Sequence, residues 1–157
     1  MKIEDKQKLA KSFISAIPHS EALGMEIGET GWAYAYLSIP YNEKFIGNPE
    51  TGVLHGGVVT ALLDTCCGTA VLMHPRMGGA TATIDLRIDY MRPAKPGARL
   101  TARADCYHTT RSVAFVRAVA YADDPNAPVA MATGAFTFTP APDAPTLDEV
   151  LGGQAND

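Results

Sequence analysis

The chain has 157 residues, 46% of them hydrophobic, and a formal net charge of −4 at pH 7. This length and composition fit a single domain that can bury its own core without disulfides or a structural metal. A negative net charge without a cluster of lysine and arginine excludes the electrostatic footprint of a nucleic-acid-binding protein.

The N-terminal segment predicts a short amphipathic helix. Residues 3–17 carry apolar side chains near helical spacing, and Pro18 ends the pattern. The apolar positions are Ile3, Leu9, Phe13, Ala16 and Ile17. We expect residues 1–19 to form a helical segment that packs on the surface in a structural role. Residues 1–8 alternate basic and acidic side chains and lead into no apolar core, so a secretory signal is not indicated.

A hairpin and a loop are expected next. From Met25 to Pro40 the sequence is strand-like, with a turn near Gly28 to Gly31 and strict alternation from Trp32 to Ile39. Residues 41–54 are rich in Asn, Gly and Pro and show no periodic pattern, which predicts a loop.

Residues 56–73 predict a central helix. Apolar or small residues occupy nearly every face of it, which is typical of a helix surrounded by protein. The longest apolar run, Val58 to Met73, has 16 residues and contains Asp64, whereas a membrane span needs about 20 mostly apolar residues. We therefore expect a core helix that Pro75 ends, and no membrane segment.

Four strand candidates follow at regular spacing, over residues 81–92, 99–109, 112–122 and 128–139. In the first of them, apolar residues alternate with polar ones, the pattern of a sheet with one buried face. These apolar residues are Ile84, Leu86, Ile88 and Tyr90. Short, turn-rich segments separate the four candidates, so we expect an antiparallel meander.

The predicted fold class is α+β, with a long central helix wrapped by a curved antiparallel sheet of five or six strands. Residues 1–139 form this single domain, and residues 140–157, rich in proline and in small and acidic side chains, predict a mostly disordered tail. One helix cannot cover such a sheet completely. A homo-oligomer, either a dimer or a dimer of dimers, is therefore expected.

Asp64 is the one charged residue between Glu50 and Arg76, and it stands in the middle of the central helix. A carboxylate in so apolar a setting loses hydration, which makes it a stronger base or nucleophile if it stays ionised. The alternative is a small polar stripe with Thr60 and Gly68 that faces water and takes no part in chemistry.

His55-Gly56-Gly57 stand at the helix start, where the first N–H groups lack intrahelical acceptors and the macrodipole is positive. Two glycines let a substrate carbonyl approach these donors, as in an oxyanion hole; the alternative is a tight turn that His55 caps. Gly56 and Asp64 are eight residues apart, which is about 12 Å along a helix. If both act on one carbonyl, they come from different subunits.

Other chemistries have less support. The sequence contains no Gly-x-Ser-x-Gly segment, which disfavours a serine hydrolase. Cys66 and Cys67 on a buried helix indicate small core residues, and three cysteines without a Cys-x-x-Cys pair predict neither a disulfide framework nor a zinc site. The four histidines are dispersed, so no metal is expected. Together these features favour a reducing compartment and hence a cytoplasmic protein.

Three segments together resemble the PaaI-like, phenylacetate-pathway type of hotdog-fold thioesterase. They are the stretch from Asn48 to Gly57 followed by Leu63-Asp64, the strand from Thr83 to Pro93, and the segment from Thr110 to Ala114. The resemblance covers about residues 20–139. It implies that two subunits join their sheets and hydrolyse acyl-CoA thioesters at the interface, without a cofactor, because CoA is part of the substrate.

The resemblance also implies roles in the reaction. Gly56 or Gly57 donates its backbone N–H to the thioester carbonyl, and Asp64 of the partner chain attacks that carbonyl or activates water. Thr83 matches a position whose hydroxyl helps to place the water.

Further roles concern substrate binding. Asn48 and His55 orient the substrate or the loop, and Arg111 and Ser112 meet the phosphates or the pantetheine of CoA. In the family pattern the asparagine stands one residue nearer the HGG, so Asn48 departs from it.

Three alternatives remain open on the sequence alone, and the third of them is an assembly role without any ligand. A hotdog hydratase or dehydratase shares the thioester ligand, although its Asp and His signature is not apparent. A non-catalytic module would hold acyl-CoA without hydrolysing it, since fold does not determine function. The acyl group, the choice between nucleophile and base for Asp64, and the choice between dimer and tetramer are likewise open.

Overall fold

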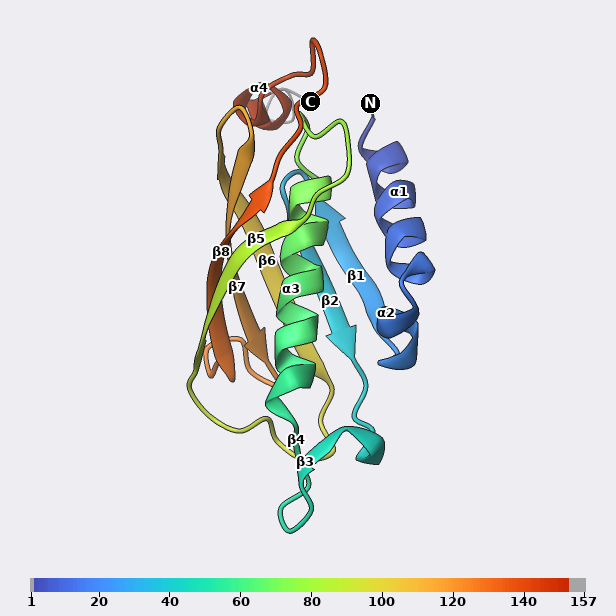
Figure 1. Ribbon diagram of the computed structural model, residues 1–157, viewed down its shortest axis with the longest axis vertical. Coiled ribbons are helices and arrows are strands. Elements are labelled where there is room, and N and C mark those ends of the chain that lie inside the picture. Colours follow the sequence, from blue (N-terminus) through green and yellow to red (C-terminus); the bar gives the residue numbers. More distant parts are fainter. Residues whose placement is uncertain (1, 153–157) are drawn as a thin grey trace.

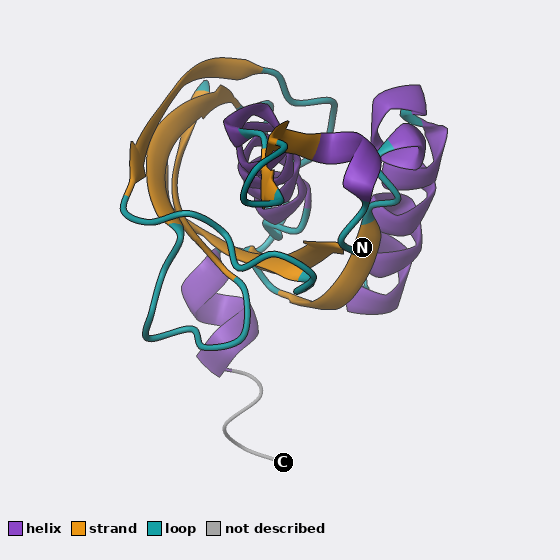
Figure 2. Cartoon of the chain, turned by 90° about the horizontal axis from the view of Figure 1, so that it is seen from below, coloured by secondary structure: helices purple, strands orange, loops and turns teal. Residues whose placement is uncertain are grey.

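The computed structural model describes residues 2–152. A curved, six-stranded antiparallel sheet wraps around one long helix, α3 (Gly56–Leu72), as Figures 1 and 2 show. The strand order is β1-β2-β6-β7-β8-β5. The strands are β1 (Glu26–Gly31), β2 (Tyr34–Ile39), β5 (Thr83–Tyr90), β6 (Leu100–Thr109), β7 (Val113–Tyr121) and β8 (Ala130–Thr137). The expected α+β architecture is confirmed.

The remaining elements are short. Helices α1 (Ile3–Ala16) and α2 (Pro18–Ala22) precede the sheet, and α4 (Leu147–Gly152) follows it. Between β2 and α3 lie the 3-10 turn η1 (Glu43–Phe45) and a small hairpin of β3 (Ile46–Asn48) and β4 (Val53–Leu54). No helix within residues 2–152 is long and apolar enough to cross a membrane.

The concave face of the sheet is lined mainly by alanine. Every second residue of a strand points to the same face, so one face of each strand packs on α3. The buried alanines on this face are Ala35, Ala102, Ala104, Ala114, Ala118, Ala120, Ala130 and Ala132. Because alanine has only a methyl group, α3 can lie close to the strands, and its own buried residues fill the space with larger side chains such as Leu62, Leu63 and Val71.

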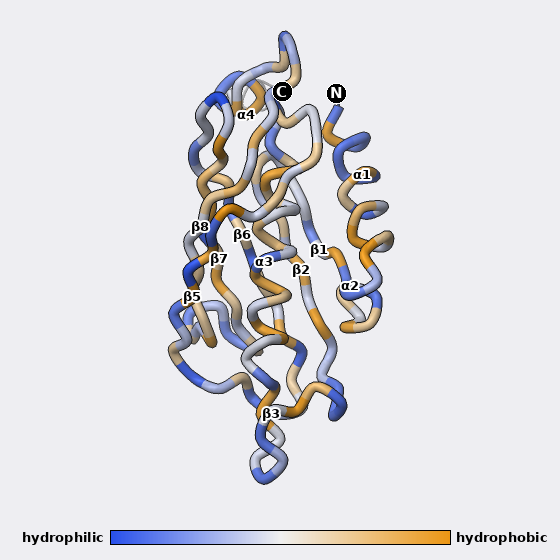
Figure 3. Tube along the Cα trace, viewed as in Figure 1, coloured by the Kyte–Doolittle hydropathy of each residue, from blue (hydrophilic) through white to orange (hydrophobic). Residues whose placement is uncertain are grey.

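Helix α1 packs beside β1 and α3 on a different face from the one expected (Figure 1). Its buried residues are Lys6, Ala10 and Ile14, whereas Leu9 and Phe13 are 49% and 37% exposed. Figure 3 shows apolar and polar stretches alternating along the helix. The expected apolar face is therefore partly open to solvent, because the small Ala10 lets α1 approach the core where Leu9 would not fit.

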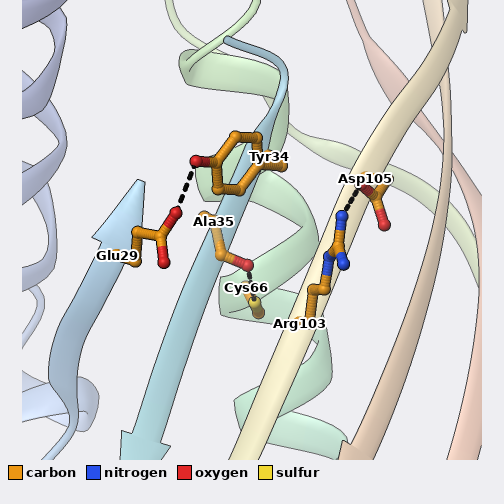
Figure 4. A network of polar contacts seen from close by, with 6 residues as sticks. All are labelled: Glu29, Tyr34, Ala35, Cys66, Arg103 and Asp105. Atoms are coloured by element: carbon orange, nitrogen blue, oxygen red, sulfur yellow. Dashed lines mark hydrogen bonds and ion pairs between the residues drawn. The ribbon is translucent and has the colours of Figure 1, made fainter. Parts of the chain in front are cut away.

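The β1–β2 turn lies at Trp32 and Ala33, not at Gly28 to Gly31 as expected. Ala33 takes a positive φ of 62° and is buried. A Cβ at Gly31 would lie 2.3 Å from the ring of Tyr34 in β2, so this glycine makes room for that ring beside β1. The hydroxyl of Tyr34 donates to Glu29 across the hairpin (Figure 4).

The prediction of a four-stranded meander is wrong for its first strand, β5. Strands β6, β7 and β8 are consecutive neighbours, but β5 pairs with β8, and β6 pairs with β2. The connection from β5 to β6 contains Pro93 and Pro96, which have no N–H and cannot continue a ladder. It crosses the end of the sheet, and β5 becomes an edge strand with Ile84 and Tyr90 largely exposed.

The segment after β8 is more ordered than expected. Pro140 forms an isolated bridge with Met77, and α4 follows, with Leu147 packed against the core. The expectation of a mostly disordered tail is thus wrong for residues 140–152, and residues 153–157 lie outside the described part.

Cys66 and Cys67 are core residues, as predicted. The Cys66 thiol donates to the carbonyl of Ala35 at 3.3 Å (Figure 4), and burial raises its pKa to about 12. Burial also raises the pKa of Cys67 well above its usual range. Neither thiol is a nucleophile at neutral pH.

A buried lysine ties α1 to the end of α3. Lys6 is 2% exposed, and its Nζ donates to the carbonyls of Leu72 at 3.1 Å and Met77 at 2.9 Å. The carbonyls at a helix C-terminus lack intrahelical donors, so the lysine satisfies a group that would otherwise be buried without a partner. Desolvation of the ammonium lowers the pKa of Lys6 from 10.5 to about 8.

We predict that the protein gains stability relative to Lys6→Met as the pH rises from about 8 to 10.5. In this window the unfolded chain still holds the Lys6 proton and the folded chain has released it, so stability rises with pH. The neutral amine keeps two N–H groups for the two carbonyls. Urea unfolding of both proteins, at about pH 7 and about pH 9.5, measures the difference in their free energies of unfolding. An equal difference at both pH values contradicts the prediction.

Candidate active site

One face of α3 is not covered by the sheet. The residues on it are small or polar: Gly57, Thr60, Ala61, Asp64 and Thr65. They line a groove of about 430 Å³, the α3 groove, whose other walls are His19 of α2 and Leu86 of β5. In Figure 1, α3 lies in front of the sheet, between β5 and α2. The expectation that protein surrounds α3 on nearly every side is therefore wrong for the single chain.

Asp64 lies in the middle of this open face and is held by Thr83. Its Oδ1 accepts a hydrogen bond from the Thr83 hydroxyl at 2.8 Å. Strict alternation would place Thr83 on the outer face with Asp85. The register of β5 against β8 shifts between Thr83 and Asp85, and such an irregularity re-aims a side chain. The hydroxyl thereby reaches α3 and fixes the orientation of the carboxylate.

Asp64 also borders a second, smaller space. This hollow of about 200 Å³, the Asp64 hollow, lies between α3 and the end of α1. Its walls include Phe13, Ile17 and Phe136, together with residues 81–83. The carboxylate thus stands between the α3 groove on one side and an aromatic-lined hollow on the other.

The start of α3 is built around His55. Its Nδ1 accepts the Gly57 N–H at 2.9 Å, so His55 is the N-cap, as the alternative interpretation of this turn stated. A Cβ at Gly47 would lie 2.7 Å from the His55 Cα, so this glycine lets the β3 hairpin pack against the cap. The Gly56 N–H has no acceptor among residues 2–152, and the residue is exposed. Of the two glycines, Gly56 is the one with a free donor.

Tyr90 also contacts the start of α3, although the sequence did not identify it as a site residue. Its hydroxyl donates to the Gly56 carbonyl at 3.0 Å and contacts the Thr60 hydroxyl. The sequence indicated only an apolar strand residue at this position, and no pattern could show where the phenol oxygen would point. Phe13 and Ile17 were likewise interpreted as one side of a surface helix rather than as walls of the Asp64 hollow.

Asn48 lies at the same end of the molecule as the helix start, but its hydrogen bonds are made to neighbouring residues of its own turn. Its Oδ1 accepts the Glu50 N–H at 3.0 Å, and its carbonyl accepts the Gly52 N–H at 2.9 Å. These bonds form the turn between β3 and β4. The side chain is exposed, and within one chain it does not contact Asp64 or Thr83.

Arg111 and Ser112 lie in the β6–β7 turn, at the opposite end of the molecule from Gly56. The Ser112 carbonyl accepts the Phe138 N–H at 2.9 Å, and the Phe138 ring stacks edge-on against His74, beyond the C-terminus of α3. The predicted site residues therefore form three groups in one chain: the helix start with Asn48, the pair Asp64 and Thr83, and the β6–β7 turn.

Across the described residues, no group of three or more His, Cys, Asp or Glu side chains is placed to hold a metal ion. The chemistry that this arrangement can perform is that of a fixed carboxylate in an open groove, with a helix N-terminus two turns away. Eight residues separate Gly56 from Asp64, or about 12 Å along α3, so one chain cannot bring both to one carbonyl.

Comparison with known proteins gives a consistent answer. The thioesterase superfamily matches residues 51–129, which include α3 and β5 to β7. The medium/long-chain acyl-CoA thioesterase YigI of Salmonella typhimurium is 30% identical over 129 residues, 74% of this chain and 83% of that protein.

Solved structures agree. A crystal structure of a Pseudomonas aeruginosa protein is 40% identical, with a TM-score of 0.76, over 87% of this chain and 98% of that one. The E. coli PaaI protein from the phenylacetic acid degradation operon, at 20% identity and a TM-score of 0.75, covers 86% of this chain and 94% of its own, and so shows a common fold. The expected hotdog fold of PaaI-like type is confirmed.

The cap at the helix start gives a stability prediction that is independent of catalysis. His55→Ala removes the acceptor of the Gly57 N–H, and we expect the free energy of unfolding to fall by about 1 kcal/mol in urea. His55→Asn is the matched control, because asparagine accepts the same type of bond at an N-cap; it should stay within a few tenths of a kcal/mol of the unchanged protein. Equal losses in both variants would mean that the cap is not what His55 contributes.

Proposed function

The chain belongs to the thioesterase superfamily and is a thioester hydrolase, and on that premise we propose that it hydrolyses acyl-CoA thioesters to the free acid and CoA. The observation that carries this proposal is the Asp64 carboxylate, held by the Thr83 hydroxyl on the open face of α3. The relative named as a medium/long-chain acyl-CoA thioesterase supports the choice of substrate class.

Asp64 acts as the general base in this proposal. Oδ1 is engaged by Thr83, and Oδ2 is left to take a proton from water. The water oxygen bonds to the thioester carbon, and the carbonyl oxygen becomes an oxyanion. When the tetrahedral intermediate collapses, the carbon–sulfur bond breaks, and the CoA thiolate takes the proton back from Asp64. Each atom and charge is then accounted for, and the carboxylate is regenerated.

The oxyanion is stabilised by the Gly56 N–H at the N-terminus of α3. This N–H belongs to an exposed residue and has no acceptor among the described residues, whereas the Gly57 N–H already donates to His55. The positive end of the helix macrodipole adds to the interaction. Because about 12 Å separates Gly56 from Asp64 of the same chain, the Gly56 that serves one Asp64 belongs to the partner subunit.

Strand β5 is the surface at which two chains pair. It is the edge of the sheet beyond β8, and its outer side has no partner within residues 2–152, whereas α1 packs against the other edge strand, β1. Ile84 and Tyr90 on β5 are 56% and 53% exposed, and an open apolar edge favours pairing with another strand. Antiparallel pairing of two β5 strands about a two-fold axis runs the two α3 helices in opposite directions, which brings each Gly56 toward the other chain's Asp64.

The other predicted residues take binding roles in this assembly. Arg111 and Ser112 at the β6–β7 turn meet the phosphates or the pantetheine of CoA, and Asn48 beside the helix start helps to orient the thioester. Further association of such dimers into a dimer of dimers is compatible with this arrangement, because the outer face of the sheet is not used by it.

Two substitutions test the two halves of the site. Asp64→Asn keeps the shape of the base and removes its basicity, while Gly56→Pro removes the N–H and adds the proline ring. Proline is tolerated at the first helical position, and His55 at φ −60° and ψ 136° already has the backbone that a following proline requires. We expect each variant to lower kcat/KM for acyl-CoA by about 10²-fold to 10³-fold, measured as release of free CoA thiol.

Gly56→Ala is the control for Gly56→Pro, because it keeps the N–H and its Cβ would meet the Tyr90 ring at an ordinary 3.7 Å. It should stay close to the unchanged enzyme. Thiol release by Asp64→Asn at the unchanged rate would contradict the role of the base. A single turnover in oxygen-18 water labels the product acid if Asp64 activates water. The product acid stays unlabelled, and the label enters Asp64, if Asp64 attacks the thioester and water then cleaves the resulting anhydride at the Asp64 carboxyl carbon. Binding of acyl-CoA by the unchanged protein without any release would favour a non-catalytic module.

Mixed dimers test whether the site crosses the subunit interface. Chains with Asp64→Asn and chains with Gly56→Pro are each impaired alone, but a mixed dimer holds one site with both groups intact. With random pairing, half of the dimers are mixed and half of their sites are complete, so we expect the unsorted preparation to recover about a quarter of the unchanged activity and the isolated mixed dimer about half. Co-expression with two affinity tags isolates the mixed species. If it is no more active than either parent, both groups act within one chain.

A further inference from the structure

An apolar space continues from the Asp64 hollow along α1. We propose that this space, the α1 trough, binds the far part of the acyl chain, and that Leu9 and Phe13 select medium and long straight chains. The trough has a volume of about 310 Å³. Its walls are Lys6, Leu9, Phe13, Leu72, Met77 and residues 78–81. The inference rests on the proposed function.

The two spaces share Phe13 and Thr81, so a chain leaving Asp64 can pass from one into the other. The order along α1 supports this path. Ile17 lines only the Asp64 hollow, Phe13 lines both spaces, and Leu9 lines only the trough. Residues four apart lie on one face of a helix, so these three side chains form a single apolar line that leads away from the carboxylate.

The chemistry of the trough suits an alkyl chain. Leu9 and Phe13 are 49% and 37% exposed, although large apolar side chains gain free energy when they are buried. Leu72 and Met77 are buried beneath them. An alkyl chain that lies between Leu9 and Phe13 on one side and Leu72 and Met77 on the other would bury apolar surface of the chain and of the protein.

The opposite wall is made of backbone and is rigid. A Cβ at Gly78 would lie 2.7 Å from the Cβ of Ala141, so no side chain can be added there without displacing the neighbouring segment. The Gly78 N–H donates to the Thr139 carbonyl at 2.9 Å, and the Ala141 N–H donates to the Arg76 carbonyl at 2.7 Å. These bonds tie this wall to the segment that follows β8.

The length of the trough sets the length of the chain. From Phe13 to Lys6 is seven residues, or about 10 Å along α1. Carbon–carbon bonds of about 1.5 Å in a zigzag advance about 1.3 Å each, so about eight carbons span this distance. The trough ends at Lys6, whose amine is engaged by the carbonyls of Leu72 and Met77 and presents a polar boundary to a methyl end. The trough therefore holds about the last eight carbons of an acyl chain whose carbonyl end lies in the Asp64 hollow.

The larger hollow on the outer face of the sheet is not an alternative for this chain. It is lined by Met91, Val119 and Met131 with several charged residues. On β7 and β8, Val119 and Met131 alternate with the buried Ala120 and Ala132 that face α3. An acyl group bonded to a carbonyl at Asp64 cannot reach that side of the sheet.

The experiment measures kcat/KM for butanoyl-, octanoyl- and dodecanoyl-CoA. We expect Leu9→Gln, and more strongly Leu9→Gln with Phe13→Gln, to lower the dodecanoyl-to-butanoyl ratio about tenfold or more, mainly through KM. Glutamine is a good helix former, and both positions are exposed, so folding is preserved. Leu9→Met keeps an apolar side chain and should keep the ratio. Leu151→Gln, at a residue 47% exposed on α4, is the control for the same change outside the trough.

The outcomes distinguish a failure of the α1 trough to bind the acyl chain from a failure of the protein to hydrolyse thioesters. An unchanged ratio in the double variant, or an equal loss for all three substrates, overturns the role of the α1 trough while thioester hydrolysis stands. A ratio that falls equally with Leu151→Gln also overturns it. If the unchanged protein releases no thiol from any of the three substrates, the proposed function fails and the inference fails with it.

Discussion

The close packing of α3 against an alanine-lined sheet is the constraint on which the rest of the structure depends. Because the inner positions of β6, β7 and β8 are largely alanine, the sheet can curl around the helix and enclose it on three sides (Figure 2). The fourth side stays open, and it carries the small and polar residues of α3, Asp64 among them. The margins of that opening are β5 on one side and α1 with α2 on the other, so the same packing that builds the core defines the groove.

Much of this fold could be predicted from the sequence, because alternation along β2 and the uniform apolarity of α3 reflect burial within one chain. The failures have identifiable causes. The apolar residues of β5 alternate as if buried, yet Ile84 and Tyr90 are exposed, and alternation alone does not say whether the same chain or another covers a face. Gly28 and Gly31 suggested a turn, whereas packing around Tyr36 and Tyr34 explains them. On α1, the small Ala10 faces the core and the large Leu9 does not, which reverses the usual rule.

For the candidate site, the sequence indicated which groups to examine but not how they meet. A lone carboxylate on an apolar helix and two glycines at the helix start stand out by residue type and position. The hydrogen bond from Thr83 to Asp64 depends on an irregularity in the β5 ladder, which no residue pattern encodes. The distinction between Gly56 and Gly57 depends on the direction of the His55 ring, and the role of Tyr90 depends on where its hydroxyl ends. Such details follow from three-dimensional packing.

Because Gly56 and Asp64 of one chain lie about two helical turns apart, the proposed site is complete only when a second chain contributes to it. The most direct measurement is a structure of the protein with a CoA ketone analogue, which keeps the carbonyl and cannot be hydrolysed. We predict a dimer in which the analogue's carbonyl oxygen lies about 3 Å from the Gly56 nitrogen of one subunit, while its carbonyl carbon faces Asp64 of the other. A carbonyl bound at Asp64 with no helix N-terminus beside it, or bound to both groups of a single chain, would contradict the account.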